Sequence, residues 1–394
     1  MEKETQKSGC SKNPADTPAV SGSEPLESLR LRIDEIDLGI IKLLAERQAE
    51  VDRMVSLKKA QNLPVHHPAR EENMVSERRS LGADMGLDPD HLEEMFRAIM
   101  RRSRVNQTET ISRKGVRPGA TVLIVGGTRG MGRYFLNWFK RSGYNTRAMG
   151  SRDWDNIGSL CSGIDLALIS VPIESTEAVV ERIAAYLPQG CVLADLTSIK
   201  ERPMKAMMEA HKGPVIGLHP LFGPTTSSMD KQIVVTTPGR DDEACRWLND
   251  QLIAWGAVLV QSDPKQHDDI MAVVQALRHF ATFIFGRFLF MRRIDLFRTL
   301  EFSSPIYRLE LGMVGRLFAQ DPALYSEIIF ASPERRALIK DYIVSITEGI
   351  DMVEKGDKEE FNRQFRQIAE WFGPFSEQAM RESTFLIEKL IERF

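Results

Sequence analysis

The sequence has few of the features that would place it at once in a broad class of proteins. Its four cysteines are scattered through 394 residues, with no CxxC pair and no spacing typical of a metal site. We therefore expect no disulfide framework and no metal centre, and the pattern fits a reducing cytoplasm. The net charge is only −3, which gives no electrostatic reason to expect nucleic acid or an acidic membrane surface as a partner.

Long apolar runs are also missing. The most apolar segment, Phe280 to Met291, is interrupted by Arg287 and is too short to span a bilayer. Residues 1–23 are polar and contain no apolar stretch typical of a signal peptide, so we expect a disordered tail. The sequence thus indicates a soluble, cytoplasmic protein, and its length predicts two or three domains.

The chain is organised around a glycine-rich segment near its middle. An apolar run, Val122 to Val125, is followed by the glycine-rich turn 126–132 and by a helical pattern over 133–140. A Rossmann fold uses this order to place a dinucleotide pyrophosphate at a helix N-terminus. The spacing departs from G-x-G-x-x-G, so a tight turn in another kind of α/β domain is the alternative. The expected cofactor-binding residues here are Gly126, Gly127, Thr128, Arg129, Gly130, Met131 and Gly132.

Strands and helices alternate over residues 119–262. Apolar runs at 166–171, 191–195, 215–218 and 233–236 predict a mostly parallel sheet with helices on both faces. Ligands of such sheets bind beyond the carboxyl ends of the strands. Segments 195–200 and 219–224 follow such ends. A third segment at such an end, which we expect to contact the cofactor, consists of Ser170, Val171 and Pro172.

The end of the second predicted strand bears on which nucleotide binds. An NAD site usually has Asp or Glu there for the ribose hydroxyls, whereas this strand runs into Gly150-Ser151-Arg152. A hydroxyl and a guanidinium suit a 2′-phosphate, so Ser151 and Arg152 favour NADP over NAD, and Arg129 could assist. The alternative is that Asp153 or a main-chain group replaces the usual acid.

An all-helical module is expected before the α/β domain. Apolar residues recur at three- and four-residue steps from about Leu26 to about Ala60, which predicts one helix of roughly 50 Å. A helix of that length needs a second partner, most simply another copy of itself. Arg47 and Lys58 lie on its apolar face within roughly 20° of each other, while Arg30 points elsewhere. Two further helices follow, and a three-helix interaction domain with snorkelling cations is the alternative.

The polar residues of this module carry a resemblance. Leu29-Arg30-x-x-Ile33-Asp34, Lys58, Arg70-Glu71 and Ser103-x-x-x-Gln107 resemble the all-helical chorismate mutases over residues 26–107. That family rearranges chorismate to prephenate by binding the dianion in its reactive shape, with no proton transfer. The resemblance implies that Arg30, from a partner subunit, and Arg47 hold carboxylates, that Lys58 and Gln107 face the ether oxygen, and that Glu71 holds a hydroxyl. Arg70 and Ser103 would line the same pocket.

A second resemblance covers about residue 120 to the C-terminus. His219-Pro-Leu-Phe-Gly-Pro224, just beyond a predicted strand, and Asp195-Leu-Thr-Ser-Ile-Lys200 resemble prephenate dehydrogenase. The resemblance implies that His219 accepts the proton of the prephenate hydroxyl while hydride passes to the nicotinamide, with Ser198 beside it and no metal. Arg316 would bind the ring carboxylate. Further substrate contacts are expected from His279, Arg308 and Tyr325, with packing as the alternative for His279 and Tyr325.

The C-terminal region, 263–394, is expected to be helical. Its Phe-rich run is too apolar for a solvent-facing surface and indicates a subunit interface, most simply in a homodimer. The predicted architecture is thus multidomain: a tail (1–23), an all-α mutase module (24–108), a linker (109–118), a Rossmann domain (119–262) and an all-α dimerisation domain (263–394).

Together the two resemblances indicate a bifunctional chorismate mutase–prephenate dehydrogenase of tyrosine synthesis. It would convert chorismate through prephenate to 4-hydroxyphenylpyruvate with NAD or NADP. An arogenate dehydrogenase on the same fold is the second hypothesis. A non-catalytic nucleotide-sensing protein is the third, motivated by the shifted glycine and Arg129.

Overall fold

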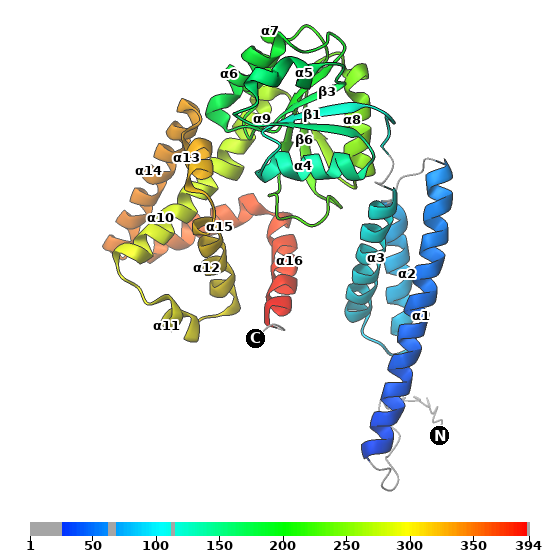
Figure 1. The fold of residues 1–394 in the computed structure, drawn as a ribbon. Coiled ribbons are helices and arrows are strands. Elements are labelled where there is room, and N and C mark those ends of the chain that lie inside the picture. The colour runs from blue at the N-terminus through cyan, green and yellow to red at the C-terminus, as the bar shows by residue number, and fades with distance from the viewer. Residues whose placement is uncertain (1–25, 62–67, 112–114, 392–394) are drawn as a thin grey trace, which may run out of the picture.

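The computed structural model of the protein describes residues 26–61, 68–111 and 115–391. The side chains at 56, 58–61, 68 and 108–111 lie outside this description. Figure 1 shows an N-terminal helical unit, a central α/β unit and a C-terminal helical unit, which confirms the predicted fold class. Among the described residues, no helix combines the length and the apolar character needed to cross a membrane.

The N-terminal unit consists of three helices, as predicted. They are α1 (Leu26–Gln61), α2 (Pro68–Asp84) and α3 (Pro89–Ile111). Because no Pro or Gly interrupts α3, it continues into residues 109–111, which the sequence had suggested as linker. In Figure 1 the N-terminal part of α1 extends beyond the other two helices. The apolar stripe of this part is exposed, with Ile33 57% and Ile36 52% accessible, so it lacks a described packing partner.

The central unit is built on a seven-stranded sheet of order β2-β1-β3-β4-β5-β6-β7. All neighbouring strands are parallel except β5 and β6, which confirms the expected mostly parallel sheet. The strands are β1 (Thr121–Val125), β2 (Asn145–Met149), β3 (Leu166–Ile169), β4 (Val192–Asp195), β5 (Val215–Pro220), β6 (Ile233–Arg240) and β7 (Val258–Gln261). One prediction is corrected: His219 lies within β5 rather than just beyond it, because pairing with Val235 of β6 extends the strand.

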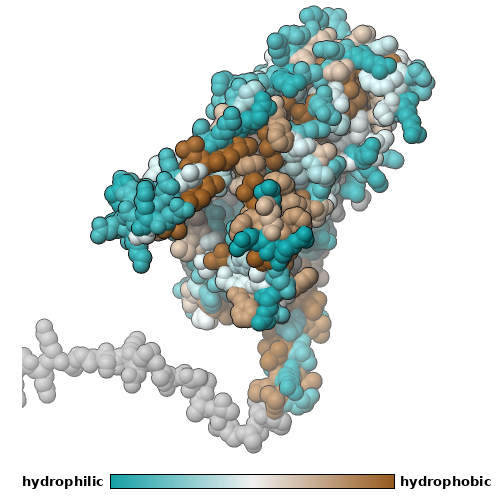
Figure 2. All heavy atoms as spheres, turned by 90° about the vertical axis from the view of Figure 1, so that its left-hand side faces the viewer, coloured by the Kyte–Doolittle hydropathy of each residue, from teal (hydrophilic) through white to brown (hydrophobic). Residues whose placement is uncertain are grey.

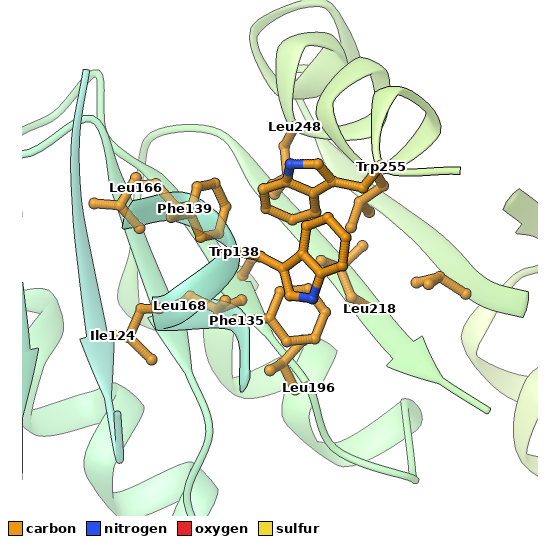
Figure 3. Packing of buried hydrophobic residues seen from close by; sticks show 14 of the residues in the cluster. Ile124, Phe135, Trp138, Phe139, Leu166, Leu168, Leu196, Leu218, Leu248 and Trp255 are labelled. Carbon is orange, nitrogen blue, oxygen red and sulfur yellow. The ribbon is translucent and has the colours of Figure 1, made fainter. Parts of the chain in front are cut away.

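Helices cover both faces of the sheet. They are α4 (Gly130–Arg141), α5 (Ile157–Cys161), α6 (Ile173–Ala184), α7 (Glu201–Ala210) and α8 (Asp242–Ala254), with a short 3₁₀ turn, η1 (Trp154–Asn156). Side chains of β1 alternate between the two faces: Val122 and Ile124 join one apolar cluster, Leu123 and Val125 the other. The first cluster includes Trp138 and Trp255, whose ring centroids are 5.5 Å apart (Figure 3).

The C-terminal unit is helical throughout its described length. It contains α9 (Pro264–Met271), a π-helical turn η2 (Ala272–Leu277), α10 (Arg278–Met291), α11 (Leu296–Glu301), α12 (Pro305–Phe318), α13 (Pro322–Phe330), α14 (Pro333–Lys355), α15 (Lys358–Phe372) and α16 (Pro374–Ile391). The Phe-rich helix α10 exposes large apolar side chains, among them Phe288 at 55% and Phe290 at 67%. Figure 2 shows apolar side chains gathered on this part of the molecule.

Candidate functional site

The glycine-rich loop after β1 packs tightly against the end of β3. Gly126 has a φ of +84°, and a Cβ there would lie 2.0 Å from the carbonyl oxygen of Ser170. A Cβ on Gly132 would lie 2.4 Å from the carbonyl oxygen of Gly126. Both positions therefore require glycine. Because β2 and β3 lie on opposite sides of β1, the loop stands at the point where the strand order reverses, where α/β sheets bind ligands.

The loop leads into a helix that can receive an anion. Helix α4 begins at Gly130 with Arg129 at its N-cap, and no described side chain caps it. The N–H groups of its first turn are therefore available to phosphate oxygens. Thr128, Arg129 and Gly130 are exposed, and Met131 is half-buried against the core. This cradle fits a dinucleotide pyrophosphate.

The segment after β3 faces the same loop. Ser170 and Val171 are half-buried and Pro172 is exposed, so the expected cofactor-contacting segment is accessible. The next backbone N–H, of Ile173, donates to Glu327 of α13 at 2.8 Å. The cofactor cradle therefore borders the C-terminal helices.

The end of β2 offers both signs of charge. Ser151 and Arg152 are exposed there. The carboxylate of Asp153 accepts a hydrogen bond from the backbone N–H of Gly150 at 2.7 Å. The acid that the sequence suggested as a substitute is thus present at the strand end, where its oxygen is engaged with the backbone.

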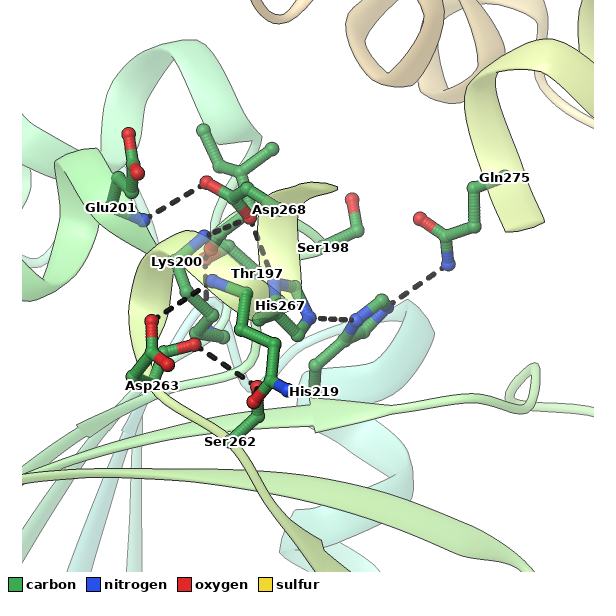
Figure 4. Close-up of polar contacts among 12 residues, drawn as sticks. Thr197, Ser198, Lys200, Glu201, His219, Ser262, Asp263, His267, Asp268 and Gln275 are labelled. Carbon is green, nitrogen blue, oxygen red and sulfur yellow. Dashed lines mark hydrogen bonds and ion pairs between the residues drawn. The ribbon is translucent and has the colours of Figure 1, made fainter. Parts of the chain in front are cut away.

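The predicted base His219 belongs to a chain of hydrogen bonds (Figure 4). Its Nδ1 lies 2.8 Å from His267 Nε2, and His267 Nδ1 lies 2.8 Å from Asp268 Oδ1. On the other side of the ring, His219 Nε2 lies 3.1 Å from the amide nitrogen of Gln275 in the π-helical turn. We name His219, His267 and Asp268 the histidine relay.

The hydrogen bonds determine the tautomers of the relay. An ionised Asp268 only accepts, so Nδ1–H of His267 donates to it and leaves Nε2 of His267 as an acceptor. Nδ1–H of His219 then donates to that Nε2. Nε2 of His219 remains an acceptor, and the Gln275 amide donates to it. The ring nitrogen that faces away from the relay is therefore the one that can take a proton.

Electrostatics keep the relay in this state. Burial holds the pKa of His219 well below its ordinary value, and the nearby His267, Lys200 and Arg335 lower it further. For Asp268, burial raises the pKa, but hydrogen bonds from His267 and the backbone outweigh this effect, so its pKa lies below the ordinary value. His219 is therefore neutral and Asp268 ionised near neutral pH.

The segment after β4, which contains Ser198, is hydrogen-bonded to the relay through its backbone. Lys200 is completely buried, and its Nζ lies 2.5 Å from Asp195 Oδ2. Its backbone N–H and that of Glu201 donate to the two carboxylate oxygens of Asp268, which ties the segment to the relay. Ser198, between these anchors, is half-buried and appears with them in Figure 4.

A second cluster forms one helical turn beyond Gln275. The rings of His279 and Tyr325 meet edge to face with centroids 4.8 Å apart, and an Arg278 nitrogen lies 3.3 Å from His279 Nδ1. Burial raises the pKa of Tyr325, while the positive charges of Arg278 and Arg316 act to lower it. The structure therefore brings two predicted residues into contact, His279 and Tyr325, and the charge of the exposed Arg316 acts on the phenol.

Arg308 lies elsewhere. Its guanidinium donates to the backbone carbonyl of Leu300 at 2.5 Å. It lines an apolar hollow between α10, α11 and α12 with Phe290, Phe297 and Phe318. The structure does not bring Arg308 to the His279 cluster.

The predicted mutase residues also converge, from three helices. Arg47 of α1 donates to the Ser103 hydroxyl of α3 at 2.9 Å, and burial with the neighbouring Arg78 lowers the pKa of Arg47. Gln107, one turn after Ser103, is buried, and its Oε1 has no described hydrogen-bond partner. Glu71 of α2 accepts from Arg104 of α3 at 2.6 Å.

Two other predicted mutase residues, Arg30 and Arg70, are exposed, and the third is Lys58. Arg30 lies on the protruding part of α1 with its side chain 65% exposed, 3.7 Å from Glu27. The side chain of Lys58 lies outside the described residues.

Comparison with known proteins identifies both halves of the chain. Residues 29–108 match the family described as chorismate mutase type II, residues 146–261 the nucleotide-binding domain of prephenate dehydrogenase, and residues 263–367 its dimerization domain. The T-protein of Enterobacter agglomerans is 42% identical over 362 residues, which cover 92% of this chain and 97% of that protein. The T-protein of Haemophilus influenzae is 38% identical over 370 residues, covering 94% and 98%.

The chain belongs to the T-protein family. It is a bifunctional enzyme of tyrosine biosynthesis, with a chorismate mutase domain and a nucleotide-binding prephenate dehydrogenase on one polypeptide. Among solved structures, the prephenate dehydrogenase from Aquifex aeolicus, in complex with hydroxyphenyl propionate and NAD⁺, has a similar fold. Its TM-score is 0.53 at 18% identity, covering 64% of this chain and 97% of that one.

Sequence reasoning missed part of the dehydrogenase site. Three residues of the site were not predicted: His267 and Asp268 of α9, which belong to the relay, and Gln275 of η2, which contacts His219. Adjacent His and Asp at the start of the helical region were the available signal. A metal site was not expected, and the described residues contain no group of His, Cys, Asp or Glu able to hold a metal ion.

The buried His279 predicts acid sensitivity of the C-terminal domain. Burial and Arg278 lower its pKa to about 4, whereas histidine in an unfolded chain titrates near about 6.5. Between these values only the unfolded state binds a proton here, so stability present above about pH 6.5 is lost as the pH falls towards about 4. Thermal midpoints should therefore drop between about pH 7 and about pH 5. The thermal midpoint of His279→Gln should drop less than that of wild type over this pH range. The midpoint of the control His91→Gln, at an exposed position, should drop as much as that of wild type. If the midpoint of His279→Gln drops as much as that of wild type, His279 is not the source of the acid sensitivity.

Proposed function

We propose that the converging residues of α1, α2 and α3 are the mutase site that turns chorismate into prephenate. This rearrangement moves no proton, so the residues need only to bind the dianion in a reactive shape and stabilise charge on the breaking ether bond. The Arg47 guanidinium stays charged even where burial lowers its pKa, which suits a substrate carboxylate. Gln107 suits the same role, because its side chain is buried in the pocket and its amide N–H₂ group can donate a hydrogen bond to the ether oxygen.

The remaining mutase residues enter the proposal through a second copy of the chain. Arg30 is exposed on a helix whose apolar stripe has no described partner. In a homodimer paired along α1, Arg30 of each copy reaches the pocket of the other. Lys58, Arg70 and Glu71 complete the pocket as the family resemblance implies. The exposed apolar face of α10, in the segment that matches a dimerization domain, supports the same homodimer.

For the dehydrogenase we propose that His219 Nε2 accepts the proton of the prephenate hydroxyl. The observation that carries this role is the relay, which leaves Nε2 as the acceptor of a neutral, buried imidazole. The substrate hydroxyl takes the place of the Gln275 amide. The residues of the glycine-rich loop would hold NAD or NADP, which would supply the acceptor for the hydride of the carbon that bears this hydroxyl, and the ring carboxylate would leave as CO₂ when the ring becomes aromatic. As the proton leaves, Asp268 stabilises positive charge that develops on the two imidazoles.

The other half of the substrate is proposed to lie along η2 and α10. Prephenate carries two carboxylates, so it needs cations and not only the neutral relay. Arg316 supplies one for the ring carboxylate, and His279, one helical turn after Gln275, adds a further contact together with Tyr325. Ser198 contacts the same hydroxyl as His219. Arg308, held at Leu300, is assigned the weakest role, because a contact would require it to leave the hollow.

We further propose that the enzyme prefers NADP. Ser151 and Arg152 are exposed at the end of β2, and Arg129 stands at the α4 N-cap, so a hydroxyl and two cations surround the expected position of a 2′-phosphate. Asp153 is the opposing feature, but its oxygen already accepts from Gly150. The free thiols of Cys161, Cys191 and Cys245 support a reducing cytoplasm as its location.

Parallel assays test these assignments. Wild-type protein should convert chorismate and should reduce NADP⁺ faster than NAD⁺ with prephenate. Arg152→Ala should raise KM for NADP⁺ about tenfold and change KM for NAD⁺ less than about twofold. Arg202→Ala, an exposed arginine of α7 paired with Glu177, is the matched control. If the wild-type enzyme prefers NAD⁺, the proposed binding of a 2′-phosphate by Ser151 and Arg152 is wrong. If it oxidises arogenate but not prephenate, arogenate replaces prephenate as the proposed substrate.

A further inference from the structure

A buried ion cluster joins the mutase helices to the dehydrogenase domain. Arg104 of α3 donates from one terminal nitrogen to Glu71 at 2.6 Å and from Nε to both carboxylate oxygens of Asp230, at 3.1 and 3.2 Å. The side chains of Arg104, Glu71 and Asp230 are 8%, 14% and 6% exposed. Two carboxylates from two domains therefore share one guanidinium, largely out of contact with water.

Asp230 is held firmly by its own domain. Its neighbour Met229 is fully buried in the apolar cluster that also contains Trp138 and Trp255. The backbone N–H of Lys231 donates to the carbonyl of Gly256 at 2.8 Å, and a Cβ on Gly256 would lie 3.0 Å from the Asp230 Cα. The backbone that carries the Asp230 carboxylate, in the connection between β5 and β6, is therefore held in place, so the carboxylate can fix the position of Arg104.

We propose that Asp230 is a positioning residue for the mutase site, supplied by the dehydrogenase domain. The inference rests on the proposed role of Glu71 as a substrate ligand. Asp230 holds the Nε side of the Arg104 guanidinium. The orientation of this rigid group is then fixed, and so is the position at which its terminal nitrogen donates to Glu71. Without Asp230, the buried Arg104 has lost half of its charge compensation and turns more fully onto Glu71. Glu71 then no longer has the position that the substrate hydroxyl requires.

The connection between β5 and β6 also links the proposed dehydrogenase site to the proposed mutase site along the chain. It leaves β5 after His219 and Pro220 and reaches Asp230 eleven residues after His219. Lys231, next in sequence, brings its Nζ to 4.0 Å from Glu71. One loop of the dehydrogenase thus begins at the proposed base and ends against a proposed mutase ligand. The mutase pocket is complete only when the dehydrogenase domain is folded beside it.

The test compares single and double variants of the full-length enzyme. Asp230→Asn should lower kcat/KM for chorismate about tenfold, while prephenate oxidation by the same sample changes less than about twofold. Glu71→Gln should be strongly impaired as a mutase, and adding Asp230→Asn to it should cause no further loss, because Asp230 acts through Glu71. Asp250→Asn, the same change at an exposed position of α8, is the matched control and should behave as wild type.

Each outcome decides the proposal. A mutase kcat/KM within about twofold of wild type in Asp230→Asn overturns it, as does an equal loss from this change in the Glu71→Gln background. If Glu71→Gln alone retains full activity, the assigned role of Glu71 has failed, and that single variant shows it. Should Asp230→Asn fold poorly, Arg104→Lys repeats the test, since one ammonium nitrogen cannot reproduce the two-sided contact.

Discussion

Replacing His219 with asparagine should lower the kcat/KM for prephenate by about a thousandfold. Asparagine is smaller than histidine and fits the same space, and its amide can still hydrogen-bond His267, but that amide cannot take up the proton of the substrate hydroxyl. Chorismate conversion by the same sample should be unchanged, because His219 lies in β5 and outside the mutase helices. The measurement is cofactor reduction followed by absorbance, with chorismate loss as the internal check on folding.

The control is another buried histidine of the same domain. His211 is 3% exposed and contacts the carbonyl of Cys191 at 2.8 Å, away from the relay. His211→Asn makes the same chemical change and should retain dehydrogenase activity to within about threefold. Near-normal turnover by His219→Asn, or equal losses in both variants, would remove His219 from the role of base.

Replacing Arg47 with glutamine should abolish most mutase activity and leave the dehydrogenase intact. The guanidinium is partly buried and anchored at Ser103, so it supplies a preorganised positive charge that a neutral amide lacks. We expect kcat/KM for chorismate to fall by about a thousandfold. The measurement is chorismate disappearance, with prephenate oxidation assayed in parallel.

A second arginine of the same helix provides the control. Arg53 is exposed and pairs with Glu50 at 2.7 Å on the surface of α1. Arg53→Gln removes one positive charge from the same element and should keep both activities, since exposed ion pairs contribute little. A mutase rate in Arg47→Gln that matches the rate in Arg53→Gln contradicts the assigned site.

Local patterns in the sequence were sufficient for much of the fold. The three-residue and four-residue steps of apolar side chains predicted α1 from 26 to about 60, close to its observed end at Gln61. The glycine-rich turn also connects a strand to a helix, as predicted, despite its unusual spacing. Glycine is retained where a Cβ would strike backbone, at Gly126 and Gly132, whereas Arg129 occupies an exposed N-cap that tolerates a side chain.

Contacts between distant segments could not be predicted in the same way. His267 lies 48 residues from His219 and Asp230 lies 126 residues from Arg104, so neither pair leaves a periodic signal. The strand β7 was missed because its apolar run, Val258 to Val260, is short and its side chains are mostly exposed. Gln275 reaches His219 from a π-helical turn, whose extra residue per turn changes the phase expected of an α-helix.

Two apolar faces without a described partner, on α1 and on α10, set a condition on symmetry. Each face can pair with the same face of another copy about a two-fold axis. If the two axes differed, every molecule would bind two different neighbours, and the assembly would be a closed tetramer or larger, or an open-ended string. A closed pair requires one common axis for both contacts. In the proposed homodimer, the mutase helices and the C-terminal helices of one chain would therefore face the same neighbour, which restricts their mutual orientation.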